Sequence, residues 1–544
     1  MKFLKAHTFF LFFFFIFCLL LFKDVFSART LISNMEPFPD SIHYVNAVRS
    51  LLSGDGLFIV REGRALATSV PPLYSFFLAP AYILNNDPRM FYFINVLLAL
   101  ASYFIFYRLL IILVNNSIIR NFILFLYITN YYLYWFPNLA MAENLILFLF
   151  VSFLMLLLSK ASRFNIFMAG LLAISFYATK YASVPLTACA LLAYFIKLIY
   201  LWRNGKLKIK GFLLFFSSSF IAFMAFSLSE YITKNVIPFS FLITFGSNFS
   251  SQTSQSAEQV SAAPRWFSLV YAKENISHYL NVITGGSERF LWDFSPMAPR
   301  FVAISGLLGL ILGILTKTHR LISITLLIML VSSVLFMSTF YSVDMRYIYQ
   351  TIPTLLLGFG IFMQIIVNRI KKPQLKILFY IGLAFLIIFY FSLNALRIKN
   401  QIMLNIKHSE TPWYYMTVQE LNKYFTSDKI LVGKKPIVIS PIPPYYIDFF
   451  SNGNYTLMPL SPQQEFRNSK ETVYGPNDYS DLIKLYQTYI KNGYGVYVNK
   501  YGIGNESYLN EDFQNIVSRF KLIEVASGCF DACNIYKVEL KTGI

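Results

Sequence analysis

The chain has 544 residues, of which 56% are hydrophobic and only 13% are charged, and its mean hydropathy is +0.54. This composition excludes an ordinary soluble domain and is typical of a protein with many membrane spans. The formal net charge of +19 does not indicate nucleic-acid binding, because much of it falls in short loops between apolar runs, where membrane topology accounts for it.

Apolar runs recur from the N-terminus to residue 396. Since a span needs roughly 20 mostly apolar residues, these runs predict about eleven transmembrane helices. They are residues 8–22, 91–114, 118–136, 144–158, 166–178, 183–201, 212–232, 301–315, 321–341, 348–367 and 375–396. The first run also fits a cleaved signal peptide, with Lys2 and Lys5 before a short apolar core and a cleavage site at Val25-Phe26-Ser27.

Five basic clusters between these runs predict the orientation. Cytoplasmic loops collect Lys and Arg, so we expect the clusters and the N-terminus on the cytoplasmic side of the plasma (inner) membrane. The clusters are Arg108 with Arg120; Lys160 with Arg163; Lys197, Arg203, Lys206, Lys208 and Lys210; Lys317, His319 and Arg320; and Arg369, Lys371, Lys372 and Lys376. Segment 70–84 is apolar but short, and counting it as a span would divide the clusters between two sides. It is therefore predicted to lie along the outer surface.

This topology turns three regions outward: residues 23–90, residues 235–300 and everything after residue 396. The last region has a different pattern of apolar and polar residues from the rest of the chain. Strand-like runs at 436–440 and 495–498 and a helix-like run at 481–491 predict a mixed α/β domain. We therefore expect a membrane module over 1–396 and an extracytoplasmic α/β domain over 397–544, which is long enough to bury its own core.

Two outward features remain open. The low-complexity stretch 246–264 is either a flexible connection or a lid that orders over a substrate. Cys529 and Cys533 lie in an outward domain where a disulfide can form, and a structural bridge is favoured over two free thiols or a metal site. Cys18 and Cys189 fall inside predicted spans and behave as small hydrophobes.

The first outward loop carries the first candidate for chemistry. Asp40 follows a proline and precedes a helical pattern that Gly54 closes. Asp40 therefore suits the N-cap of this helix, which requires no catalysis, although one carboxylate can cap a helix and act as a base.

A set of short motifs, taken in order, resembles the multi-spanning glycosyltransferases of GT-C fold that use polyprenyl-phosphate sugars. The nearest groups are the protein O-mannosyltransferases, of the glycosyltransferase family 39 type, and the aminoarabinose or mannose transferases of bacterial envelopes. The resemblance extends over nearly the whole chain, and the order of its motifs is more specific than any one of them. The motifs are Asp40-Ser41 with Tyr44, Leu51-Leu52-Ser53-Gly54-Asp55-Gly56, Pro71-Pro72-Leu73-Tyr74, Ala142-Glu143-Asn144, Thr179-Lys180-Tyr181, Met345-Arg346-Tyr347 with Pro353, residues 436–459, and Cys533-Asn534-Ile535-Tyr536-Lys537-Val538.

The resemblance implies an inverting transfer of a hexose or pentose to an envelope glycan, lipid or protein, without a covalent sugar-enzyme intermediate. Asp40 would be the general base for the acceptor hydroxyl. Tyr44 and Tyr347 would bind substrate. Glu143 would orient the acceptor or help hold a divalent metal such as Mg²⁺. As a structural residue, Glu143 would instead be an exposed loop carboxylate.

Arg346 and Lys180 support this assignment on physical grounds. Transfer from a polyprenyl-phosphate sugar turns a phosphodiester into a phosphomonoester, so negative charge grows on phosphate oxygens at the membrane surface. Cations fixed there stabilise the transition state, and both residues fall at predicted outer helix ends. The alternative role for each is anchoring at lipid head groups.

The sequence also departs from its nearest relatives. Protein O-mannosyltransferases usually carry an acidic pair where this chain has Asp40-Ser41, and Val70 stands where aminoarabinose transferases commonly have a basic residue. The Trp292-Asp293 pair lies between helices rather than in the outward domain of an oligosaccharyltransferase. An envelope polysaccharide polymerase or ligase, a lipid-linked-glycan transporter and a non-catalytic assembly protein are the rival classes. A transporter would show ionisable residues within spans and paired repeats, whereas most charges of this chain fall at the predicted helix ends.

Overall fold

The structure is a computed structural model. It describes residues 2–25, 40–54, 56–61, 64–67, 71–84, 89–138, 140–234, 267–289, 293–294, 296–317, 319–340, 343–407, 413–426, 434–440, 451, 453–460, 479–499, 507–527 and 534–541. The chain divides into two compact units, Met1–Ser27 with Val70–Leu404 and Ala28–Ser69 with Asn405–Ile544. Most of the predicted first outward loop thus belongs to the same unit as the C-terminal region.

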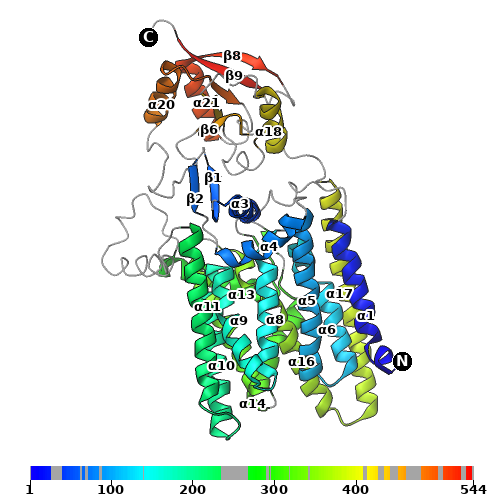
Figure 1. Cartoon of the computed structure of the whole chain (residues 1–544). Helices are drawn as coiled ribbons and strands as arrows, with labels where there is room; N and C mark the ends of the chain where they lie inside the picture. Colours follow the sequence, from blue (N-terminus) through cyan, green and yellow to red (C-terminus); the bar gives the residue numbers. More distant parts are fainter. Residues whose placement is uncertain are drawn as a thin grey trace. The chain divides into compact units, whose positions relative to one another are not determined.

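The first unit is a bundle of apolar helices (Figure 1). Among the described residues, six helices are long and apolar enough to cross a membrane, and shorter apolar helices cover the other predicted runs. The number of spans stays a prediction. The helices are α1 (Lys2–Val25), α4 (Pro72–Leu84), α5 (Arg89–Leu113), α6 (Ser117–Ile128), α7 (Tyr131–Trp135), α8 (Glu143–Leu158), α9 (Arg163–Thr179), α10 (Val184–Arg203), α11 (Lys210–Lys234), α13 (Leu269–Ile283), α14 (Arg300–Leu315), α15 (Arg320–Ser338), α16 (Thr351–Arg369) and α17 (Pro373–Lys407).

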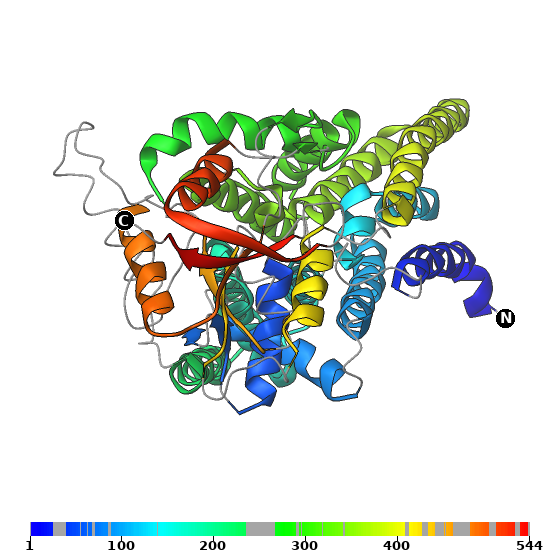
Figure 2. The same cartoon turned by 90° about the horizontal axis from the view of Figure 1, so that it is seen from above.

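Two ends of the bundle are distinct. The basic turn between α10 and α11 lies at the end where α1 begins, and α4 lies across the opposite end (Figure 1). Helix α1 packs against α5 and α6 at the rim (Figure 2), with Phe17 and Leu21 buried. The short helix α4 thus lies at one end of the bundle. Its position along the outer membrane surface stays a prediction.

One predicted helix is interrupted. The apolar run 118–136 forms α6 and then a separate short helix, α7, because the Asn130 side chain caps the second one. Its Oδ1 accepts hydrogen bonds from the amides of Tyr132 at 3.0 Å and Leu133 at 3.3 Å, and its Nδ2 donates to the carbonyl of Met297 at 2.8 Å. Asparagine favours such N-cap positions over a helix interior, so the break is local chemistry that hydropathy alone does not register.

Helices α14 and α16 approach each other closely through glycines. A Cβ atom on Gly309 would lie 1.9 Å from the carbonyl oxygen of Gly358, and one on Gly358 would lie 2.3 Å from that of Gly306. Small residues let membrane helices pack backbone against backbone, where dispersion contacts replace the hydrophobic effect that lipid does not supply. The pair α14 and α16 therefore requires glycine at these positions.

Lys197 shows how a buried charge in this unit is satisfied. Its side chain on α10 is buried, and its Nζ donates to the carbonyls of Leu156 at 2.9 Å and Ser159 at 2.7 Å. These are carbonyls at the C-terminal end of α8, which have no partner inside their own helix. Lys197 therefore caps α8 from a neighbouring helix.

We expect Lys197→Met to lower the free energy of unfolding by about 1–3 kcal/mol, because two half-buried carbonyls lose a charged donor. Thermal unfolding in detergent measures this effect. Lys160→Met is the matched control, since Lys160 is exposed. Equal stability of the two variants would show that the cap contributes nothing.

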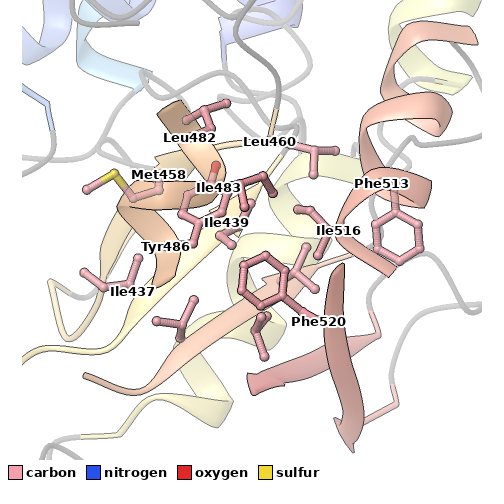
Figure 3. Packing of buried hydrophobic residues seen from close by; sticks show 13 residues of the cluster. Ile437, Ile439, Met458, Leu460, Leu482, Ile483, Tyr486, Phe513, Ile516 and Phe520 are labelled. Carbon is pink, nitrogen blue, oxygen red and sulfur yellow. The ribbon is translucent and has the colours of Figure 1, made fainter. Parts of the chain in front are cut away.

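The second unit holds a five-stranded mixed sheet in the order β6-β5-β7-β9-β8, with β6, β5 and β7 parallel and β7, β9 and β8 antiparallel. Residues from its strands and from two helices form one apolar core (Figure 3). The strands predicted at 436–440 and 495–498 and the helix predicted at 481–491 are present. The elements are α3 (Asp40–Leu52), β1 (Phe58–Arg61), β2 (Arg64–Ala67), α18 (Trp413–Tyr424), β5 (Ile437–Ser440), β6 (Thr456–Pro459), α20 (Tyr479–Lys491), β7 (Val496–Asn499), α21 (Ser507–Arg519), β8 (Phe520–Ala526) and β9 (Ile535–Leu540).

Candidate active site

Arg346 is held in place by the turn that carries it. The turn is a short 3-10 helix, Met345–Ile348, and Asp344 caps it by accepting a hydrogen bond from the Arg346 amide at 2.9 Å. The other Asp344 oxygen accepts from the guanidinium Nε at 2.6 Å, with a second guanidinium nitrogen at 2.5 Å. The hydroxyl of Tyr279 on α13 accepts from the Asp344 amide at 3.2 Å. The guanidinium is therefore oriented before any ligand arrives.

Lys180 and Glu143 form the second charged pair. Lys180 follows the last residue of α9 in extended conformation, and its ammonium is paired with Oε1 of Glu143, the first residue of α8. Glu143 is only 1% exposed, and its Oε2 has no hydrogen-bond partner among the described residues. A helix N-terminus favours a carboxylate, which is why Glu143 is stable there.

The ring of Tyr347 lies beside both cations. The Lys180 ammonium is 4.5 Å from the ring centroid and the Arg346 guanidinium carbon is 5.9 Å from it. The face of a tyrosine ring attracts cations electrostatically. The Tyr347 ring therefore helps to hold the two positive charges of Lys180 and Arg346 close to each other. The α8 start, the α9 end and the turn before α16 thus converge on a single cluster.

Three further residues form a chain of contacts that leads to Arg346. Asn95 of α5 donates to the carbonyl of Met141 at 3.4 Å, and the sulfur of Met141 lies 3.9 Å from a guanidinium nitrogen of Arg346. The hydroxyl of Tyr74 on α4 donates to Oδ1 of Asn95 at 3.0 Å. Burial raises the pKa of Tyr74 well above its usual value, so this hydroxyl keeps its proton and remains a donor.

The cluster lies at the end of the helices away from the basic turns. Helix α9 begins at Arg163, in one basic cluster, and ends next to Lys180; α16 ends at Arg369, in another, and follows Arg346. The two cations face two carboxylates, so their formal charges balance. An incoming phosphate would share Lys180 and Arg346 with Glu143 and Asp344, and its oxygens would meet donors that are already oriented.

The structure brings together four of the predicted site residues, namely Glu143, Lys180, Arg346 and Tyr347. The alternative that Glu143 is an exposed loop carboxylate is wrong, because its side chain is buried and ion-paired. The sequence interpretation missed Asp344, whose position two residues before Arg346 is a capping signal. It also missed Asn95, which has no distinguishing pattern around it.

Asp40 and Tyr44 lie in the other compact unit, and their catalytic and binding roles stay predictions. Helix α3 begins at Asp40, Tyr44 is buried, and Gly54 follows the helix with a φ of 89° that glycine tolerates. The stretch 246–264, Trp292 and the pair Cys529 and Cys533 lie outside the described residues. Within the described ranges, no group of three or more His, Cys, Asp or Glu side chains is placed to hold a metal ion.

No protein-family model matches the chain, and no curated protein matches it either. Solved structures that resemble it along nearly its whole length include ArnT from Cupriavidus metallidurans bound to undecaprenyl phosphate and the same protein in the apo state. Each aligns with a TM-score of 0.57 and 12% sequence identity and covers 98% of both chains.

The chain has the GT-C fold of ArnT. This confirms the predicted fold class, a polytopic helical membrane protein of GT-C type. At 12% identity the likeness to ArnT is one of fold, and ArnT and this chain share it from end to end. The orientation of the termini and the extracytoplasmic placement of the C-terminal domain stay predictions.

Proposed function

We propose that the protein is an inverting glycosyltransferase that moves a sugar from a polyprenyl-phosphate donor to an envelope glycan, lipid or protein on the outer face of the membrane. The observation that carries this proposal is the cluster of Lys180 and Arg346 around Tyr347, at the bundle end opposite the basic turns. The fold adds support, since ArnT, which has the same fold, was solved with undecaprenyl phosphate bound.

The proposed reaction follows from the charges. The acceptor hydroxyl oxygen bonds to the anomeric carbon as the bond from that carbon to the phosphate oxygen breaks. Asp40 takes the hydroxyl proton, and the electron pair of the broken bond stays on the leaving polyprenyl phosphate. Because the phosphate gains negative charge, Arg346 and Lys180 bind the transition state more strongly than the donor, which is the condition for a rate gain.

Glu143 is the proposed contact for a substrate hydroxyl, because its buried Oε2 can accept a hydrogen bond that no described residue supplies. Dependence on a divalent metal such as Mg²⁺ stays a prediction. The described cluster is poorly suited to a metal, because the Glu143 carboxylate is paired with an ammonium group. No step of the proposed reaction therefore passes through a metal.

Asp40→Asn tests this proposal. With purified protein and polyprenyl-phosphate sugars carrying a radiolabel, we expect the wild type to label an envelope extract and Asp40→Asn to lose about 10²–10⁴-fold in rate, the usual contribution of a general base. Asp481→Asn is the matched control, since it makes the same change at an exposed aspartate of α20. Equal rates for Asp40→Asn and the wild type would remove Asp40 as the base.

A further inference from the structure

The turn between α9 and α10 is fastened on two sides by buried glutamates. Lys180 is paired with Glu143 of α8, and the next residue, Tyr181, donates its hydroxyl hydrogen bond to Oε1 of Glu230 on α11. Backbone hydrogen bonds shape the turn, since the Lys180 amide bonds back to Phe176 and the Ser183 amide to Lys180. The side-chain contacts on both flanks add to these bonds and tie the turn to α8 and α11.

Glu230 is an unusual residue for its surroundings. It is 2% exposed near the end of α11, a helix otherwise long and apolar enough to span a membrane. Ionisable residues in such segments are costly and are retained mainly where they serve a site. Nothing in the proposed reaction uses Glu230 directly.

Aromatic residues enclose the contact between Tyr181 and Glu230. The ring of Tyr177 lies 5.5 Å from that of Tyr181 and 5.2 Å from that of Phe226 on α11. Leu73 of α4 packs against the same apolar cluster. Water is largely excluded from this neighbourhood, so a hydrogen bond to a carboxylate is stronger here than at a surface.

We propose that the hydrogen bond from Tyr181 to Glu230 is a positioning contact that holds Lys180 in the active site. The proposal rests on the proposed function, in which Lys180 binds the donor phosphate. Tyr181 and Glu230 touch no reacting atom in this account. They act through the turn, so that Glu143 and a phosphate can share Lys180 without its backbone moving away.

Chemical labelling of Lys180 tests the contact without requiring any activity. In Tyr181→Phe, we expect reductive methylation of Lys180, followed by mass spectrometry, to be about three- to tenfold faster than in the wild type, the change that loss of one hydrogen bond produces. Tyr177→Phe is the matched control, because it removes a hydroxyl one turn earlier and keeps the ring contacts. The exposed Lys160 should react equally in all three proteins. An unchanged Lys180 rate in Tyr181→Phe overturns the proposal.

Glu230 variants separate positioning from simple loss of structure. Glu230→Gln retains an oxygen that accepts from Tyr181, so we expect wild-type labelling of Lys180, whereas Glu230→Leu should match Tyr181→Phe. Fast labelling in Glu230→Gln as well would mean that charge, not the hydrogen bond, holds the turn, and this would overturn the proposal.

Sugar transfer supplies the second readout. Tyr181→Phe should lower kcat/KM for the donor about three- to tenfold and leave the acceptor KM unchanged. Combined with Lys180→Met it should cause no further loss, because Tyr181 acts through Lys180. An additive loss in the double variant would contradict this route. A wild type that transfers no sugar would defeat the proposed function, while the labelling result would still decide whether the contact positions Lys180.

Discussion

Replacing Arg346 with alanine is expected to lower kcat for sugar transfer by about 10²–10³-fold, the loss that follows removal of one preorganised donor to a developing negative charge. Asp344 orients the guanidinium through two nitrogens and the turn that both residues share. In the proposed reaction, the donor phosphate would meet an arginine that needs no reorganisation, and the gain from it would be largest in the transition state.

Single-turnover transfer from a labelled lipid-phosphate donor measures this loss. Arg346→Lys should recover part of the rate, because lysine keeps the charge but cannot grip phosphate bidentately. Arg300→Ala is the matched control: Arg300 is an exposed arginine that begins α14. If Arg346→Ala and Arg300→Ala transfer sugar equally well, Arg346 anchors head groups and the proposed phosphate site is wrong.

Gly309→Ala is expected to destabilise the protein by about 3 kcal/mol or more, at the upper end of the range for overpacked cores. The added methyl group would lie 1.9 Å from the backbone oxygen of Gly358. A backbone atom in a helix cannot relieve this clash by changing rotamer, as a side-chain atom can. Helices α14 and α16 would have to separate. Since Arg346 lies in the turn that leads into α16, the site would be displaced as well.

Thermal unfolding in detergent measures the effect. Gly382→Ala is the control, because Gly382 is exposed on α17 and a Cβ there meets nothing within 4 Å. Alanine is the better helix former, so that variant should be as stable as the wild type or slightly more stable. Equal melting temperatures for Gly309→Ala and Gly382→Ala would show that the helices separate at little cost.

Hydropathy and charge were sufficient for the coarse architecture. The apolar runs, the short helix that ends at Leu84 and the mixed α/β region after the last long helix all follow from composition and periodicity, which depend on local sequence. The helix break at Asn130 could also have been predicted from the sequence, because an asparagine inside an apolar run is a capping signal. It was missed because the run was read by hydropathy alone.

The site could be predicted only as a set of positions. The motifs around Glu143, Lys180 and Arg346 predicted a common side, and the structure shows a common cluster. The contacts between these residues could not be predicted from the sequence. The pairing of Lys180 with Glu143 joins residues far apart in the chain and depends on how α8 and α9 pack. The same holds for Tyr181 and Glu230. Asp40 begins a helix in the other compact unit, so its role rests on the resemblance alone.

Release of polyprenyl phosphate by the purified wild type tests the central claim most directly. Phosphorus NMR distinguishes the phosphodiester of the donor from the phosphomonoester of the product. Incubated with a panel of polyprenyl-phosphate sugars and an envelope extract, the protein should convert diester to monoester with at least one donor, in step with transfer of the sugar. A diester signal that persists with every donor would contradict the glycosyltransferase assignment and favour a polymerase or transport function.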